Sequence, residues 1–200
     1  RVVMFRDFRQ PHDLPLLPAD IPELDPRCLL AFLQASGEGP DDAMVLPHMQ
    51  LAVDGNIDWY LTYHDTEDPL VSRDVVESYQ RLAEIFSARS YIDENALRVP
   101  RPGMFEGSAT DPAPYSMRYA WRDASARIGV MAASDNHMGA PGADDPKASD
   151  GSRYGWGEAG GVTVTLQEEA GRSGIWDALR ARRTYATTGP RFWLDWTLDG

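Results

Sequence analysis

The chain contains few of the features that would identify its compartment or chemistry directly. It has a single cysteine among its 200 residues, Cys28, which excludes an intramolecular disulfide and a cysteine-based metal site. Because Cys28 begins the apolar stretch CLLAFL, we expect a core thiol rather than a nucleophile. No apolar run approaches the roughly 20 residues of a membrane span, and the first residues do not resemble a signal peptide. A soluble protein is therefore expected, in a compartment that stays open.

Basic residues are also scarce. The 19 Lys and Arg residues face 31 Asp and Glu residues, for a formal net charge of -12. Nucleic acids and anionic membranes are bound through basic surfaces, so we expect neither as a partner. The acidic balance suits solubility, which accounts for most of the acids, and it also suits cation sites. The length of the chain predicts a single domain over residues 1–200. Because the opening RVVMFRDF has the pattern of a strand, we expect that the N-terminal strands and helices of this domain are missing.

Patterns typical of helices and strands alternate along the chain. Pro26 and Gly37 bound a predicted helix, and an apolar strand covers Ala43–Leu46. Residues 72–90 stay open, because the first half, capped by Ser72, has helical spacing and the second half alternates as a strand. Further predicted elements are helices over residues 115–127 and 173–185 and strands over residues 128–134, 160–166 and 191–198. This alternation predicts an α/β fold with a largely parallel sheet.

Histidines and acids stand where two predicted strands end. His48 follows AMVLP, and Asp135 and His137 follow IGVMAAS. Parallel α/β folds gather reactive groups at the carboxyl ends of their strands. Residues two apart on an extended backbone point the same way, so Asp135 and His137 could bind one cation or two adjacent ones, with zinc, manganese or iron the suitable metals. Each signal is weak alone, since SDN is also turn material and His48 could be a core histidine.

Glu84, in LAEIFS, has two possible environments. In a buried strand its carboxylate must be paired or bound to metal, because an isolated buried charge is too costly. On an amphipathic helix it would simply face solvent. His12 and His64 lie in polar loops and are expected to be exposed.

The order of these motifs resembles a known family. MVLPHM, LAEIFSARS and GVMAASDNHMGAPG are similar, in this order, to the second half of a PHP (polymerase and histidinol phosphatase) metal-dependent hydrolase domain. The segment GIWDALRARRTYATTGPRFWLDWTLDG resembles a bacterial PHP-like family of largely uncharacterised proteins. The resemblance extends from Phe5 to Gly200 and is weakest between Asp54 and Ser72.

The resemblance implies a distorted (β/α)7-type, TIM-like barrel with largely parallel strands and bound divalent metal ions. The metal ligands that it implies are His48, Glu84, Asp135 and His137. Asp135 and His137 would also be catalytic, in a phosphoesterase-like hydrolase that uses a metal-activated hydroxide. Arg191 and Arg89 would bind the anionic group of a small-molecule substrate such as a phosphate ester, although each could equally be a surface or ion-paired arginine.

The chain departs from the family pattern in its histidines. Such domains begin with a His-x-His pair, which is absent here, and Met49 stands where relatives often carry a second histidine. We therefore expect only part of the metal shell in this chain. One hypothesis is an enzyme whose remaining ligands lie in a longer protein, which could contain further domains. The alternative is a non-catalytic PHP-like scaffold or ligand-binding module.

Overall fold

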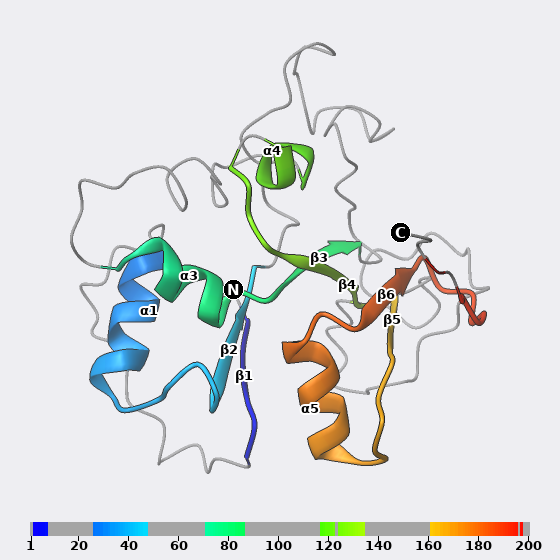
Figure 1. Ribbon diagram of the computed structural model, residues 1–200, viewed down its shortest axis with the longest axis horizontal. Helices are drawn as coiled ribbons and strands as arrows, with labels where there is room; N and C mark the ends of the chain where they lie inside the picture. Colours follow the sequence, from blue (N-terminus) through cyan, green and yellow to red (C-terminus); the bar gives the residue numbers. More distant parts are fainter. Residues whose placement is uncertain are drawn as a thin grey trace.

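The computed structural model describes residues 2–7, 26–47, 71–86, 117–122, 124–134, 161–195 and 197. These residues form a mixed α/β structure (Figure 1). Its elements, in chain order, are β1 (Val2–Phe5), α1 (Pro26–Ala35), β2 (Ala43–Leu46), α3 (Arg73–Tyr79), β3 (Leu82–Phe86), α4 (Met117–Arg122), β4 (Gly129–Ala132), β5 (Val162–Thr165), α5 (Arg172–Arg180) and β6 (Thr184–Thr187). None of the helices in these ranges combines the length and hydropathy needed to cross a membrane.

The described strands form three two-stranded ladders. Strand β1 pairs antiparallel with β2, β3 pairs parallel with β4, and β5 pairs antiparallel with β6. The α/β class is therefore confirmed, and so is a parallel arrangement for β3 and β4. The other two described pairs are antiparallel, and over the described ranges the ladders do not close into a barrel.

Hydrogen bonds outside the ladders connect neighbouring pairs of strands. The backbone N–H of Glu84 on β3 donates to the carbonyl of Pro47, directly after β2, at 3.2 Å. On the other side, the hydroxyl of Thr163 on β5 accepts from the N–H of Ala132 at 2.9 Å and donates to its carbonyl at 2.6 Å. Side-chain hydroxyls thus satisfy backbone groups of β4 that a continuous ladder would otherwise pair.

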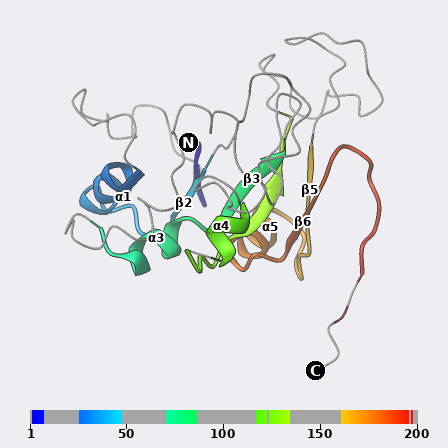
Figure 2. The ribbon, with the colours of Figure 1, turned by 90° about the horizontal axis from the view of Figure 1, so that it is seen from above.

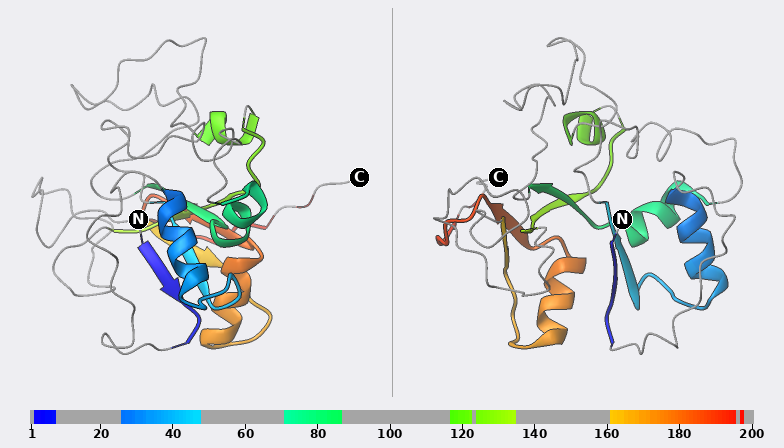
Figure 3. Two further views of the ribbon diagram at one scale, coloured as in Figure 1. Left: turned by 90° about the vertical axis from the view of Figure 1, so that its left-hand side faces the viewer. Right: turned by 180° about the vertical axis from the view of Figure 1, so that it is seen from behind.

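Alternation along the strands divides the apolar side chains between two faces. One cluster joins one face of β1–β4 to α1, α3 and α4, and includes Val3, Val45, Ala83, Leu30 and Val76. A second cluster on the opposite face, here called the α5 cluster, joins the strands to α5 and consists of Met4, Met44, Leu46, Leu82, Met131, Trp176 and Leu179. The β1–β2 ladder accordingly lies between α1 and α5 (Figures 1 and 3). Burial on both faces explains why AMVL is apolar throughout.

The boundaries of the first elements follow from local signals in the sequence. Helix α1 ends where Gly37 adopts a positive φ of 79° and its N–H donates to the carbonyl of Gln34. The predicted strand Ala43–Leu46 is confirmed as β2. The Cys28 side chain on α1 is half-buried, so the expected burial in the core is only partial.

The ambiguous segment contains both predicted structures in succession. Ser72 caps α3 by accepting a hydrogen bond from the N–H of Val75, and the helix ends at Tyr79. The next residues turn, and the alternating half forms β3 with Leu82 and Ala83 fully buried. The period change from helix to strand in the sequence therefore marks a real boundary.

Two predicted helices are longer than the observed ones. The structure contains α4 only over Met117–Arg122, and Ser125 beyond it has a positive φ of 51°. Helix α5 ends at Arg180 because Arg182 adopts a positive φ of 59°, and the residues predicted to continue the helix begin β6 instead. A left-handed residue cannot continue a right-handed helix, so the conformation of a single residue ends α5.

The predicted strand over residues 191–198 is wrong for the described part of that range. Residues 191–195 form no strand, and the segment swings away from the sheet after β6 (Figure 2). Trp193 is 77% exposed. The Tyr185 hydroxyl donates to the carbonyl of Phe192 and accepts from the N–H of Leu194, so two backbone groups that could have paired with a strand bind a side chain instead. The alternating pattern here lacks a strand partner among the described residues.

Candidate functional site

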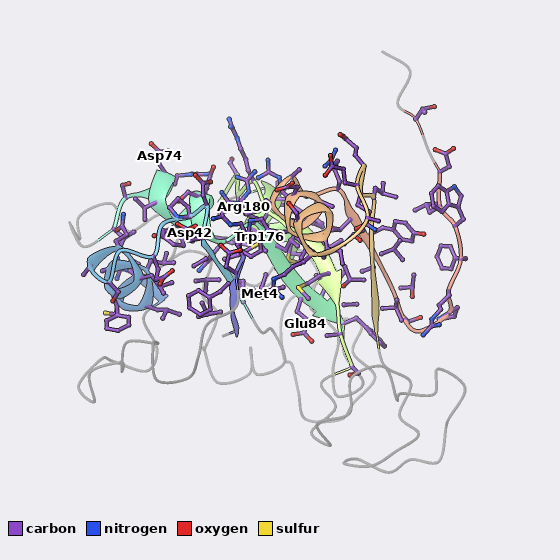
Figure 4. The ribbon with its side chains drawn as sticks, turned by 90° about the horizontal axis from the view of Figure 1, so that it is seen from below. Met4, Asp42, Asp74, Glu84, Trp176 and Arg180 are labelled. Atoms are coloured by element: carbon purple, nitrogen blue, oxygen red, sulfur yellow. The ribbon has the colours of Figure 1, made fainter. Side chains whose placement is uncertain are left out.

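Glu84 is a buried carboxylate on β3, two residues before the end of the strand. Its exposed fraction is 7%, whereas the preceding Leu82 and Ala83 are fully buried. The strand environment predicted as one of two alternatives is therefore confirmed, and the solvent-facing helix is excluded. Figure 4 shows the side chain near the carboxyl end of β3, away from Arg180 and Trp176. A carboxylate in this position offers two acceptor oxygens at the edge of the sheet.

Three strand ends meet around Glu84. The carbonyl after β2, at Pro47, accepts the hydrogen bond of the Glu84 N–H. In the parallel ladder Glu84 lies opposite Met131, and the ladder continues until the N–H of Ala133 donates to the carbonyl of Phe86 at 3.0 Å. The ends of β2, β3 and β4 therefore converge on one edge of the sheet, as expected for reactive groups in α/β folds.

The end of β6 reaches the same edge through β5. Thr187, the last residue of β6, pairs with Val162, and the adjacent Gly161 donates its N–H to the carbonyl of Ala133 at 3.0 Å. The turn that follows is closed by the N–H of Gly189 donating to the hydroxyl of Thr187. We call this region the carboxyl edge and define it as residues 46–47, 84–86, 132–134, 161 and 187–189.

The backbone at the carboxyl edge is closely packed. A Cβ atom placed on Gly161 would lie 2.6 Å from the Cβ of Ala132, 2.9 Å from Cδ1 of Phe86 and 3.0 Å from the N atom of Ala133. These separations are shorter than van der Waals contact, so only glycine lets β5 approach β4 this closely. Close approach of backbones is one way in which a sheet positions the loops that leave its edge.

Of the six predicted site residues, two lie within the described residues and four lie outside them. Glu84 is buried at the carboxyl edge, and Arg191 is exposed two residues beyond the edge's last member, Gly189. The residues outside are His48, Asp135, His137 and Arg89, as are His12, His64 and Met49. Of these, His48 is the next residue in the sequence after Pro47, and Asp135 is the next after Ser134. Among the described residues, three or more potential metal ligands do not come together.

Sequence reasoning missed a group of arginines at the opposite edge of the same strands. Arg81 directly precedes β3, and Arg182 lies two residues before β6. The Nε of Arg81 donates to the carbonyl of Arg180, the last residue of α5, at 2.9 Å. The signal in the sequence was a basic residue before the alternating half of residues 72–90 and basic residues near the C-terminus of the predicted helix over residues 173–185, but only the tertiary structure shows that they adjoin.

Comparison with known proteins gives one match. A family model described as "Protein of unknown function (DUF3604)" matches residues 146–196, about a quarter of the chain. The matched segment includes β5, α5, β6 and Arg191. No curated protein and no solved structure matches the chain.

Proposed function

We propose that the carboxyl edge forms part of a divalent-metal site in a metal-dependent, phosphoesterase-like hydrolase. The observation that carries the proposal is the burial of Glu84 at the place where three strand ends converge. A carboxylate oxygen is a suitable ligand for zinc, manganese or iron.

The remaining ligands of the proposed site come from residues that are close in sequence to the carboxyl edge. His48 and Asp135 each follow a described residue of the carboxyl edge, and consecutive Cα atoms are about 3.8 Å apart. We propose that His48, Asp135 and His137 join Glu84 as ligands. The mixed nitrogen and oxygen donors fit the metals named above. A divalent ion held there would polarise a substrate oxygen and lower the pKa of bound water.

The protein's own residues would position the substrate and move protons. We propose that Asp135 and His137, in addition to binding metal, hold the proton released when water is activated. Arg191 is exposed and follows the turn after β6, so its guanidinium is accessible to the anionic group of a small-molecule substrate. Arg89 is the second residue proposed for this role. A planar guanidinium suits phosphate because its paired N–H groups match two phosphate oxygens.

The same proposal extends to fold and family. We propose that residues 1–200 are a single domain of the PHP superfamily and part of a distorted (β/α)7-type barrel. The parallel pairing of β3 and β4 and the helices that precede β3, β4 and β6 support that arrangement. The net charge of -12 supports a small-molecule partner over nucleic acid or membrane. Further domains of a longer protein are part of the proposal.

A non-catalytic scaffold is the second candidate function. It is favoured by the absence of a His-x-His pair from the sequence, which leaves the metal shell partial. Under either function we expect these 200 residues to turn over phosphate esters poorly. Robust metal-dependent turnover of a simple phosphate monoester by this chain would contradict that expectation and exclude the scaffold.

Metal content separates the two functions. We would measure zinc, manganese and iron by plasma mass spectrometry in the parent chain, in Glu84→Gln and in the double variant Asp135→Ala, His137→Ala. Glu169→Gln, at an exposed position, is the matched control. The hydrolase proposal predicts near-stoichiometric metal in the parent and control and loss from both site variants. No metal in the parent, even after incubation with excess divalent ions, would favour the scaffold.

A further inference from the structure

Three arginines from two distant parts of the chain lie close to the residues where β3, β4 and β6 begin. We call Arg81, Arg180 and Arg182 the amino-edge arginines. Arg81 and Arg182 flank Gly129, the first residue of β4. The carbonyl of Arg81 accepts from the Gly129 N–H at 2.9 Å, and a Cβ on Gly129 would lie 3.1 Å from the Cβ of Arg182. Arg180 joins them through the hydrogen bond from Arg81 to its carbonyl.

The guanidinium groups of Arg81 and Arg180 bind backbone carbonyls at the ends of helices. Arg81 donates to the carbonyls of Arg180, at 2.9 Å, and Glu77, at 3.3 Å. Arg180 donates to the carbonyl of Ser78 at 2.6 Å. These bonds hold α3 and α5 together, but carbonyl oxygens are neutral acceptors and leave the cationic charge of each arginine in place.

Two carboxylates among the described residues, Asp41 and Glu77, act on these charges. Within the same residues Arg180 forms one ion pair, to Asp41 at 3.4 Å, and the Asp41 side chain is 88% exposed. Within the described residues, no carboxylate lies within ion-pair distance of Arg81 or Arg182, and the protein contact of Arg182 is the carbonyl of Arg127. The amino edge therefore concentrates positive charge in a protein whose net charge is -12.

The proximity of like charges affects the titration of these groups. Burial lowers the pKa of Arg81, and the neighbouring charges of Arg182 and Arg180 lower it further, against the opposing effect of Glu77. Burial also lowers the pKa of Arg180, against the opposing effect of Asp41, which raises it. An anion bound among the three would relieve both the repulsion and the cost of desolvation.

Arg182 stands at a backbone position that favours glycine. It lies two residues past the end of α5 with a φ of 59°, in the left-handed region where helices commonly end in glycine. A side chain at such a position carries a conformational cost. Ending the helix does not require an arginine here, so the contribution of the side chain must come from its guanidinium or its stem.

We infer that the amino-edge arginines bind a small phosphate-bearing anion of the diphosphate class. A guanidinium group binds phosphate oxygens through paired N–H groups, and several arginines close together suit a ligand with more than one phosphate. The negative charge of the whole protein disfavours a large polyanion. Arg81 and Glu84 are three residues apart on an extended strand, about 10 Å, so this site is separate from the proposed metal site and does not depend on it.

The test is calorimetric titration of the full chain at low ionic strength with EDTA present. Inorganic pyrophosphate and ADP are the two probes, and their comparison distinguishes an inorganic from a nucleotide source. We expect saturable binding that weakens about tenfold or more in Arg182→Gly and Arg81→Gln. Arg6→Gln removes the same charge near the opposite end of α5, where Arg172 donates to the Arg6 carbonyl, and should leave the affinity unchanged.

Two results would overturn the inference. One is the absence of saturable binding of either probe at millimolar concentration. The other is an equal loss of affinity in Arg6→Gln and Arg182→Gly, because it would show a diffuse charge effect in place of a site. Arg81→Gln removes hydrogen bonds to the ends of two helices and could fail to fold. Arg182→Gly places glycine where the backbone favours it, and therefore keeps the test decisive.

Discussion

The two edges of the β3–β4 ladder carry opposite charges in different environments. At the amino edge, arginines remain partly exposed and donate to helix carbonyls. At the carboxyl edge, a single carboxylate, Glu84, is 7% exposed. The difference follows from the order of elements, because α3, α4 and α5 each end shortly before one of β3, β4 and β6. The carboxyl ends of helices attract cations, so arginines are favoured at the amino edge of the strands they precede.

The two edges also differ in how their charges are accommodated. The partly buried guanidinium groups at the amino edge donate to backbone carbonyls, which are neutral. A buried carboxylate loses water and must obtain its stabilisation from the protein or from a bound cation. Cationic charge therefore persists at the amino edge and can attract an anion, whereas the charge at the carboxyl edge indicates a specific local requirement. The following experiments test this difference, beginning with the largest expected effect.

Removing Trp176, a buried side chain on α5, should destabilise the sheet that carries both edges. Trp176 is 5% exposed in the α5 cluster, and we expect Trp176→Ala to lower the free energy of unfolding by about 3–5 kcal/mol. Ile175, on the same helix, is 43% exposed, so Ile175→Ala is the matched control, with a loss of about 0.5 kcal/mol. Urea denaturation provides both values. Similar losses in the two variants would show that α5 does not cover a shared core.

A divalent metal ion should stabilise the protein only when the proposed metal ligands at the carboxyl edge are present. A divalent ion at 100 times its dissociation constant should raise the free energy of unfolding by about 2.7 kcal/mol in the parent. The increase should vanish in Glu84→Gln and persist in Arg182→Gly. Thermal denaturation with and without manganese or zinc measures it. An undiminished increase in Glu84→Gln would remove Glu84 from the proposed metal site.

Each edge contains a closely packed glycine, and the two should respond differently to alanine. At Gly161 the new methyl group would meet the backbone N atom of Ala133, which cannot move freely, and we expect a loss of about 2–3 kcal/mol. At Gly129 the nearest atom would be Cδ2 of Leu82, the end of a side chain that can rotate, with the Cβ of Arg182 at 3.1 Å, and we expect a smaller loss of about 1 kcal/mol. Chemical denaturation of both variants gives the comparison, and a larger loss at Gly129 would contradict it.

Arg182→Gly should stabilise the protein slightly, although it removes a charge and a hydrogen bond. A non-glycine residue in the left-handed region costs about 1–2 kcal/mol. The lost hydrogen bond to Arg127 offsets about 1 kcal/mol of that gain. We therefore expect a net increase of about 0.5 kcal/mol in the free energy of unfolding, measured by denaturant titration. A loss above about 1 kcal/mol would show that the side chain is structural.

Alkaline pH should lower the free energy of unfolding through Tyr79, the last residue of α3. Burial, followed by the charges of Asp42 and Glu38, raises the pKa of Tyr79 above 10.0, while Arg180 lowers it. The folded state therefore holds the phenolic proton more tightly than the unfolded state. This contribution is complete below pH 10 and is lost as the pH rises through the folded-state pKa. Tyr79→Phe should show a shallower decline in stability above pH 10, and an unchanged decline would exclude Tyr79 as its source.

Much of the local structure was predictable because it depends on neighbouring residues. The strand Ala43–Leu46, the cap at Ser72 and the glycine end of α1 all follow from short-range sterics and hydrogen bonding. The predictions that depended on distant partners were less successful. The alternating residues 191–195 pair with no strand among the described residues, and α5 ends before its predicted boundary at residue 185.

The sequence by itself determined the chemistry available to this protein: one cysteine, few basic residues, and a glutamate flanked by apolar residues. It left two environments open for Glu84, because the same letters suit a helix surface or a buried strand. Only the tertiary structure chose between them, by placing β3 between β2 and β4 with helices covering both faces. Tertiary packing also brought together arginines about 100 residues apart in sequence, as in the hydrogen bond from Arg81 to Arg180. Burial and long-range proximity arise when the chain folds on itself, and local sequence patterns do not encode them.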